Sequence, residues 1–273
     1  MQILAMFTCY NRKDKTEKCI KDLVSKNKNC EFTFVVADDN SNDGTKEILT
    51  NMKNEYDIHL LNGDGNLFYS GGMRLAMEYG INNLTEKFDY ILMMNDDVEF
   101  YENSVEAIIN QSKQQDNAVI VGAMCDNQNQ LSYNAIKYVK GIKYRKVELS
   151  EWTMEADTFN ANCVLIPYYI FKQIGVMDKK YIHSLGDFDY GLSIKKVGYK
   201  IYCSKDFVGL CNNNPSNNTW TDKSLSIKER IKKKENIKGA PFKQWWHFLY
   251  KNFGVFIAVK YSITPYIRIL LRK

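Results

Sequence analysis

Short apolar runs alternate with amphipathic segments along the first half of the chain. Apolar runs with the length of strands lie at residues 3–9, 32–37, 58–61 and 90–94. Helix-like segments separate them, and Asp14 with Glu17 has the spacing of a capping box at the first helix. A second helix is expected over about residues 45–56, and a third ends at Gly80. This alternation predicts an α/β fold with a doubly wound, mostly parallel central sheet and helices on both faces.

The pattern becomes less regular beyond Ala123. We expect short strands and loops over residues 126–150, a strand over 159–166, a helix over 187–197 and an edge strand over 200–203. Gly198 occupies the C-cap position of that helix. The last part of the chain, residues 211–273, predicts a helical tail.

An acidic cluster, Asn95-Asp96-Asp97, directly follows the apolar run 90–94. Open α/β sheets bind their ligands at the carboxyl ends of the strands. Oxygen ligands at such a place suit Mg²⁺ or Mn²⁺, which commonly bridge carboxylates to the oxygens of a diphosphate. An acidic turn that ends the strand and caps the next helix would explain the same three residues.

A second acidic stretch, residues 38–45, follows the run 32–37. A carboxylate at this strand end can accept hydrogen bonds from a nucleobase or a ribose. A turn with a helix N-cap accounts for the end of the stretch. It accounts less well for the two adjacent acids at its start, Asp38 and Asp39.

Glycines surround the start of the third predicted helix, where Asn66 is followed by Gly71, Gly72 and Arg74. Paired glycines allow a ligand to approach the backbone, and an exposed helix N-terminus favours phosphate. Arg74 adds a permanent cation that could pair with a diphosphate. Tight helix packing is the more common reason for paired glycines.

A third acidic stretch opens the helix predicted over 187–197. Asp187 and Asp189 flank Phe188 and therefore lie on different faces of the helix. One of them can point into a cleft and act as a general base, while the other supports the helix start. Stabilisation by the helix dipole would explain either acid without chemistry. His183 is close enough in sequence to be an acceptor-side candidate, and Asp189 is a second one.

Composition restricts the functional classes. With 45% hydrophobic residues among 273, the chain has the composition of an ordinary folded protein. A net charge of +5 is too small to indicate nucleic-acid binding. The seven cysteines lack paired spacing and favour a reducing compartment such as the cytoplasm. The apolar run 3–9 begins too soon after Met1 for a cleaved signal, so we expect no secretion by that route.

The tail mixes aromatic and basic residues, including Trp245, Trp246, Phe256 and Lys260. Its apolar run over 253–259 is too short to cross a bilayer. An amphipathic helix on a membrane surface is one interpretation. A helix packed against the rest of the protein, with its lysines in water, is the other.

These acidic stretches occur in one order along the chain, and in that order the sequence resembles the family 2 glycosyltransferases, which have the GT-A fold. The resemblance covers roughly residues 3–203 and extends to bacterial rhamnosyltransferase-like members. Family members carry counterparts of Thr8-Cys9-Tyr10-Asn11-Arg12, of the stretch 38–45, of a DxD motif at 95–97 and of a late acidic motif at 186–189. The ordered set is specific for the family, although no single motif is.

The resemblance implies roles at the donor site. Asp39 would contact the base of the nucleotide, with Asp38 beside it, and Asp97 would hold Mn²⁺ or Mg²⁺ on the diphosphate. Asn95 replaces the first acid of the DxD motif, which leaves either Asp96 or the phosphates to complete the coordination. Many relatives also have a metal-binding histidine further on, but residues 208–220 contain none and have Cys211 and Asn212 there.

The resemblance also implies the reaction. Asp187 would be the general base of an inverting transfer to a hydroxyl of a glycan or lipid-linked acceptor, in bacterial surface-polysaccharide synthesis. Asn66, Gly71, Gly72 and Arg74 resemble a stretch near the donor, which suggests a UDP- or dTDP-linked sugar. The enzyme would be cytoplasmic, with a place at the inner face of the cell membrane if the tail binds there.

We therefore expect a catalytic domain over 1–210, with its nucleotide-sugar half to about residue 123 and its acceptor half from 124, followed by the tail over 211–273. Two alternatives stay open. A non-catalytic nucleotide-sugar-binding or scaffold protein is conceivable because of Asn95 and the missing histidine. A nucleotidyltransferase is less well supported, because residues 8–14 lack the glycine-rich loop expected after its first strand.

Overall fold

One half of the central sheet consists of parallel strands in the computed structural model, which describes residues 1–84, 87–213 and 217–272. These strands are β1 (Gln2–Cys9), β2 (Glu31–Asp38), β3 (Asp57–Asn62) and β4 (Tyr90–Met94), in the spatial order β3-β2-β1-β4. They confirm the four apolar runs as strands, and the run 90–94 has the bounds of β4.

The other half of the sheet is mixed. The order continues from β4 through β11 (Cys163–Pro167), β6 (Val119–Cys125), β12 (Ile201–Leu210) and β5 (Glu99–Phe100), with β7 (Leu131–Tyr133) paired to β6. β11, β5 and β7 run against the other strands. The strand predicted at 200–203 is too short, because β12 extends to Leu210. Over residues 201–203 it pairs with β6 on one side, as an edge strand does, and β5 joins β12 at Gly209 and Leu210.

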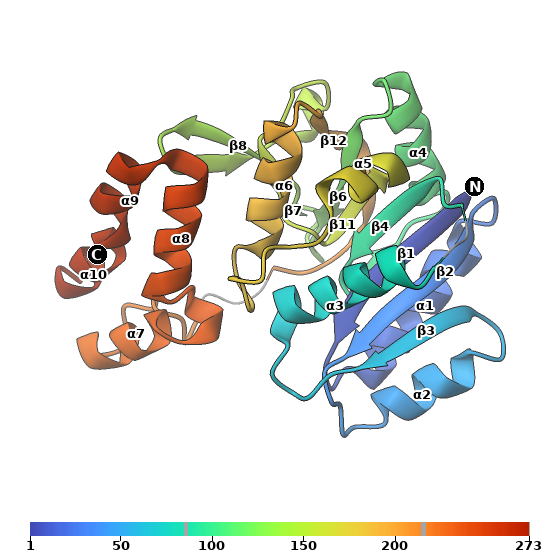
Figure 1. Ribbon diagram of the computed structural model, residues 1–273, viewed down its shortest axis with the longest axis horizontal. Coiled ribbons are helices and arrows are strands. Elements are labelled where there is room, and N and C mark those ends of the chain that lie inside the picture. Colours follow the sequence, from blue (N-terminus) through green and yellow to red (C-terminus); the bar gives the residue numbers. More distant parts are fainter. Residues whose placement is uncertain (85–86, 214–216, 273) are drawn as a thin grey trace.

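Helices cover both faces of this sheet (Figure 1). On one face lie α1 (Lys13–Lys26), α2 (Thr45–Met52) and α4 (Ser104–Gln114), and on the other α3 (Phe68–Asn82), α5 (Tyr168–Ile174) and α6 (Gly186–Lys196). β1 shows why two layers form: Ile3, Ala5 and Phe7 face the first set of helices, while Leu4 and Met6 face the second. Alternate residues of a strand point to opposite faces, so a wholly apolar strand needs cover on both sides.

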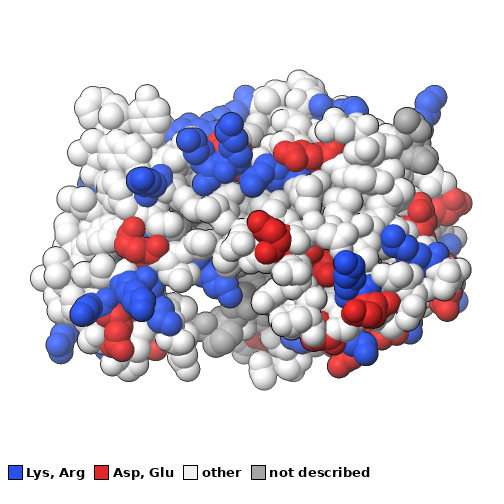
Figure 2. Space-filling model, turned by 60° about the horizontal axis from the view of Figure 1, so that its bottom comes forward, with Lys and Arg blue, Asp and Glu red and all other residues white. Residues whose placement is uncertain are grey.

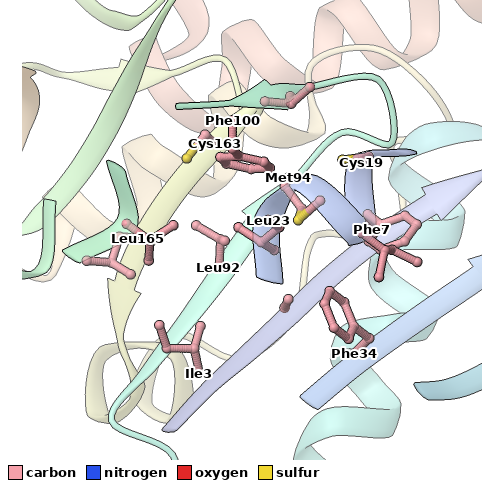
Figure 3. Close-up of a cluster of buried hydrophobic side chains, with 14 of the residues drawn as sticks. Ile3, Phe7, Cys19, Leu23, Phe34, Leu92, Met94, Phe100, Cys163 and Leu165 are labelled. Atoms are coloured by element: carbon pink, nitrogen blue, oxygen red, sulfur yellow. The ribbon is translucent and has the colours of Figure 1, made fainter. Parts of the chain in front are cut away.

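Figure 3 shows the first of these cores, where Leu23 of α1 packs over Leu92 and Met94 of β4. All three side chains are fully buried. Burial of such side chains stabilises the fold by roughly 1.5–3 kcal/mol each. The core therefore fixes the end of β4, and with it the position of the acidic turn that follows.

A smaller sheet stands beside the main one. It pairs β10 (Thr158–Phe159) with β8 (Ala135–Lys140), and β8 with β9 (Lys143–Lys146), while the short helix η1 (Leu149–Glu151) follows. This confirms short strands in 126–150. The single strand predicted over 159–166 is wrong: residues 160–162 form a turn, which lets β10 join the small sheet and β11 the main one.

The tail forms helices at one end of the molecule, beside β8 and α6 (Figure 1). They are α7 (Ile227–Lys234), η2 (Ile237–Gly239), α8 (Phe242–Phe253), α9 (Val255–Ser262) and α10 (Thr264–Leu270). Phe248 and Leu249 of α8 are buried in a separate apolar cluster with Tyr181 and Ala258. For α8, this packing confirms the interpretation in which the helix lies against the rest of the protein. None of the described helices has both the length and the hydrophobicity that crossing a bilayer requires.

The capping box predicted at Asp14 and Glu17 does not form. α1 begins at Lys13, whose N–H donates to Oδ2 of Asp43 at 3.1 Å, and the N–H of Arg12 donates to Oγ1 of Thr45 at 3.2 Å. Side chains from the loop after β2 thus cap this helix. They also tie the end of β1 to the neighbouring strand end.

Candidate functional site

A cleft of about 800 Å³ opens at the carboxyl ends of β1, β2 and β4. It is lined by Asp39, Asn95, Asp96, His183 and Asp187 among the predicted site residues. The first three follow β2 and β4, and the last two come from the segment that leads into α6. The structure therefore brings together groups that are separated by up to about 150 residues in sequence.

Asp39 holds the start of α3. Its Oδ1 accepts hydrogen bonds from the N–H groups of Gly65 (2.9 Å) and Leu67 (3.2 Å), and its Oδ2 accepts one from Phe68 (2.9 Å). Asp38 is buried below it and accepts hydrogen bonds from the N–H and the hydroxyl of Ser41. Of this pair, only Asp39 lines the cleft.

Arg12 bridges the two acids after β4. Its Nη1 lies 2.8 Å from Oδ1 of Asp96 and 2.9 Å from Oδ2 of Asp97, and Thr16 donates to Asp96 at 3.3 Å. Burial raises the pKa of Asp96 to about 6; Arg12 opposes this rise in the pKa, and Asp97 adds to it. The sequence places Arg12 at the end of the first strand, but its pairing depends on β1 and β4 being neighbours in the sheet, which the local pattern does not reveal.

The donor set for a metal is small. Asn95, Asp96 and Asp97 offer oxygen atoms, but no group of three His, Cys, Asp or Glu side chains that could hold a metal exists within residues 1–84, 87–213 and 217–272. Cys211 lies where the family's histidine would be expected, and its Sγ is 3.7 Å from Oδ1 of Asp97. Of the stretch 208–220, residues 214–216 lie outside the described part of the chain.

Asp187 stands in the first turn of α6 with its carboxylate at the cleft. Its oxygens accept hydrogen bonds from the N–H groups of Phe188 (2.8 Å) and Ala161 (3.3 Å). Burial raises its pKa from 3.8 to about 6, and these backbone donors limit the rise in the pKa. A carboxylate with a raised pKa is a better proton acceptor at neutral pH than an exposed one.

His183 also lines the cleft, with its ring edge-on to Phe68 at 6.2 Å between centroids. Its Nδ1 is buried and has no hydrogen-bond partner within the described residues. Burial and the nearby Lys238 lower its pKa to about 4, so the ring is neutral at pH 7. A neutral imidazole can donate or accept one hydrogen bond on each side.

An aromatic wall closes the cleft opposite the strand ends, and sequence reasoning missed it. Tyr138 and Tyr144 come from β8 and β9, Phe188 from α6 and Trp245 from α8. Tyr144 lies 5.4 Å from Phe188 and 6.0 Å from Tyr138 between ring centroids. The available signal was the concentration of tyrosines in 126–150, but only the packing of the tail brings Trp245 beside them.

Several predicted residues lie elsewhere. The guanidinium of Arg74 donates to the carbonyl oxygens of Asp178 (3.4 Å) and Tyr181 (3.2 Å). Gly72 packs against Thr8, where a Cβ would overlap with Oγ1. The carbonyl of Ile182 accepts from the N–H groups of Ser70 (3.0 Å) and Gly71 (3.2 Å). With Asp39, these contacts occupy four N–H groups at the start of α3, which was expected to be open to phosphate: those of Leu67, Phe68, Ser70 and Gly71.

Asn66 is exposed and does not line the cleft. Asp189 is 2% exposed and faces α8, where it accepts hydrogen bonds from Lys251 Nζ (2.6 Å) and Asn252 Nδ2 (2.8 Å). The hydroxyl of Tyr181 donates to it as well, at 3.1 Å. Asp187 and Asp189 thus lie on different faces, as expected, with Asp189 anchoring the tail.

Comparison with known proteins bears on this arrangement. Residues 5–175 match the family described as "Glycosyl transferase family 2". The low-salt glycan biosynthesis hexosyltransferase Agl10 of Haloferax volcanii is 23% identical over 223 residues, which span 78% of this chain and 69% of that protein.

Solved structures with the same fold include two complexes with nucleotide-sugars. S. aureus TarS 1-349 with UDP-GlcNAc has a TM-score of 0.58 and 15% identity, over 99% of this chain and 80% of that one. The mannosyltransferase PcManGT from Pyrobaculum calidifontis, with GDP-Man and Mn²⁺, has a TM-score of 0.58 and 10% identity, over 99% of this chain and 73% of that one. At these identities the likeness shows the fold alone, and it confirms the expected GT-A-like α/β arrangement.

Proposed function

Because the chain belongs to glycosyl transferase family 2, we propose that it is an inverting enzyme that moves a sugar from a nucleotide-sugar donor to a hydroxyl of a glycan or lipid-linked acceptor. The observation that carries this proposal is the common cleft of Asp187, Asp39 and Asp96. A proton acceptor and a nucleotide-side carboxylate face the same space, as a direct transfer requires.

In the proposed reaction, Asp187 accepts the proton of the acceptor hydroxyl. The oxygen then forms a bond to the anomeric carbon of the donor sugar as the bond from that carbon to the diphosphate breaks. The nucleoside diphosphate leaves with the electron pair of the broken bond, and the configuration at carbon inverts. Two backbone N–H groups hold the Asp187 carboxylate in place for this step.

A divalent ion, Mn²⁺ or Mg²⁺, fits the residues after β4. Asn95, Asp96 and Asp97 supply oxygen donors, which hard cations prefer. When bound, such an ion would neutralise charge on the diphosphate. Arg12 already forms ion pairs with both acids. Its guanidinium therefore also places positive charge at this site, and it would have to move away from the two carboxylates where a metal ion binds. Diphosphate oxygens or water would complete the ligand set.

We propose a UDP- or dTDP-linked donor, with Asp39 as the carboxylate nearest the base. The aromatic wall supports a sugar on the acceptor side, because aromatic rings line sites where ligands present apolar faces. We place the reaction on the cytoplasmic side of a bacterial membrane, in surface-polysaccharide synthesis. All seven cysteines are unpaired and buried, which supports a reducing compartment.

The test is thermal stabilisation of the purified protein by UDP-, dTDP- and GDP-sugars, each with Mn²⁺ or with EDTA. One donor class should raise the melting temperature, because a ligand that binds only the folded state stabilises it. Release of nucleoside diphosphate with that donor would separate a transferase from a binding protein. Stabilisation without any release, with or without a glycan acceptor, would favour the non-catalytic alternative.

A further inference from the structure

A stripe of exposed apolar side chains runs along α9 and α10. Phe256 is 88% exposed, Val259 58%, Ile263 52% and Ile267 46%. Successive members are three or four residues apart, so they lie on one side of the helices. The stripe also includes Val255, Leu270 and Leu271, which are exposed as well.

The fold does not use this stripe. Ala258, Ser262, Pro265 and Ile269 are the buried residues of α9 and α10, and they lie on the opposite side from the stripe. Contiguous exposed apolar surface of this kind marks a site of interaction with a protein or a membrane. The stripe therefore remains available after the helices have packed.

The charge of the tail distinguishes a membrane from a second copy of this chain as the partner. Residues 236–273 contain seven Lys or Arg and no Asp or Glu, although the whole chain carries only +5. Residues 1–235 accordingly have a net charge of −2. Figure 2 shows Lys and Arg side chains at its lower left with Asp and Glu side chains beside them, next to a largely uncharged left edge. A second copy would meet the same positive charge, whereas an anionic bilayer would complement it.

The turn between β8 and β9 adds exposed apolar and basic side chains beside α9. Val139 is 60% exposed, and its neighbours Lys140 and Lys143 are exposed cations. The turn lies against α9, because Ile142 packs in the cluster that contains Ala258 and Tyr261. Exposed apolar and basic groups of the hairpin therefore lie next to α9, by the side of that helix that carries Ala258.

We propose that the stripe of α9 and α10, together with the β8–β9 turn, is a docking face for an anionic membrane surface. The apolar side chains would enter the interface while Lys140, Lys143 and Lys260 contact anionic headgroups. Tyr138, Ile142 and Tyr144 of the same hairpin line the cleft. Docking would thus bring the aromatic wall close to the bilayer, and, on the proposed function, favours a lipid-linked acceptor.

The first test measures co-sedimentation of the full chain with vesicles of phosphatidylcholine and phosphatidylglycerol. Phe256→Ser with Ile267→Ser should weaken partitioning about tenfold or more, because two exposed apolar side chains no longer enter the interface. Tyr169→Ser is the control, since Tyr169 is 51% exposed on α5, outside the docking face. Equal partitioning of the stripe variant and the wild type would overturn the proposal.

The second test concerns charge. Lys140→Glu with Lys143→Glu should weaken binding to these vesicles more than tenfold, since each lysine near an anionic surface contributes about 1 kcal/mol. Lys46→Glu with Lys53→Glu makes the same charge change at exposed positions at the end of the molecule remote from the tail (Figure 1) and should weaken binding less. If both pairs of substitutions weakened vesicle binding equally, the net charge of the protein alone would account for the attraction to the vesicles, and the proposed docking face would be wrong.

Vesicles of phosphatidylcholine alone should bind the protein more weakly. If the wild type bound neither the anionic nor the neutral vesicles, the proposal would also be overturned. Light scattering gives a further test. If the wild type were a dimer in solution and the stripe variant a monomer, the stripe would be an interface between copies, and the proposal would be overturned. No donor or turnover enters these measurements, so their failure is distinct from failure of the glycosyltransferase assay.

Discussion

Nη1 of Arg12 lies 2.8 Å from Oδ1 of Asp96 and joins the end of β1 to the turn after β4. The guanidinium also reaches Asp97, so a divalent cation has to compete with it for both carboxylates. We expect Arg12→Gln to tighten Mn²⁺ binding in the absence of donor by about tenfold, because a unit charge a few ångströms away costs a cation roughly 1–4 kcal/mol. Isothermal titration with MnCl₂ measures this affinity.

Arg74→Gln is the matched control for that titration. It removes the same charge, but from a guanidinium that binds the backbone carbonyls of Asp178 and Tyr181. Its Mn²⁺ affinity should stay within about twofold of the wild type. If Arg12→Gln weakened Mn²⁺ binding instead, the arginine would support the metal rather than compete with it.

Removal of the proposed proton acceptor should abolish turnover while leaving the fold intact. We expect Asp187→Asn to lower kcat by about 10²–10⁴-fold, the usual contribution of a general base. Because burial raises the pKa of Asp187 from 3.8 to about 6 in the folded protein, the wild type loses stability as the pH rises between these two values, and the loss is complete above about 6. The substitution should therefore raise the free energy of unfolding at pH 7.5 by up to about 3 kcal/mol.

This stability gain should shrink to less than about 1 kcal/mol at pH 4, which lies close to the unfolded pKa of 3.8 and well below the folded pKa. Urea titrations at the two pH values measure it. Asp189→Asn is the control and should do the reverse, because it removes the charge of a buried carboxylate that pairs with Lys251. Full activity in Asp187→Asn would remove this residue from the mechanism.

The pH profile follows from the same carboxyl group. A general base acts in its deprotonated form, so kcat/KM should fall about tenfold per unit as the pH decreases below about 6. An exposed aspartate would produce this fall near its ordinary pKa of 3.8. Initial rates between pH 4.5 and 8, with stability checked at each pH, distinguish the two cases.

The adjacent glycines at the start of α3 should respond differently to alanine. A Cβ at Gly72 would overlap with the side chain of Thr8, so Gly72→Ala should lower stability by about 1–3 kcal/mol. A Cβ at Gly71 would lie 3.4 Å from Cβ of Leu67, an ordinary contact, and Gly71→Ala should be neutral or stabilise by up to about 1 kcal/mol. Urea midpoints of the two variants compare them directly, and equal losses would contradict the packing explanation.

Local sequence pattern predicted the four parallel strands well, because a wholly apolar run such as Tyr90–Met94 has few alternatives to a buried strand. It failed where the partner is distant in sequence. Asp14 and Glu17 have the spacing of a capping box, yet Asp43 and Thr45, which follow the neighbouring strand β2, cap the helix. The local sequence around α1 does not include these competing caps, which lie about 30 residues further along the chain.

The candidate site shows the same division. Strand ends predicted Asp39 and Asp96 at the cleft, because parallel strands place their carboxyl ends along one edge. Arg74 has the character of a diphosphate ligand in sequence, but carbonyl groups about 100 residues away occupy its guanidinium. Composition alone did not separate the tail into a packed α8 and an exposed stripe, since both contain aromatic and basic residues.

The hydrogen bonds of Asp39 link its proposed role in donor recognition to the order of a loop. A carboxylate has about four acceptor positions, and the N–H groups of Gly65, Leu67 and Phe68 occupy three of them. One position is left for a nucleotide, so a ligand that claims a second must release one of these amides. By thermodynamic reciprocity, whatever loosens this loop also changes nucleotide affinity. Hydrogen exchange at these three amides would therefore report how the nucleotide shares the carboxylate with the protein's own backbone.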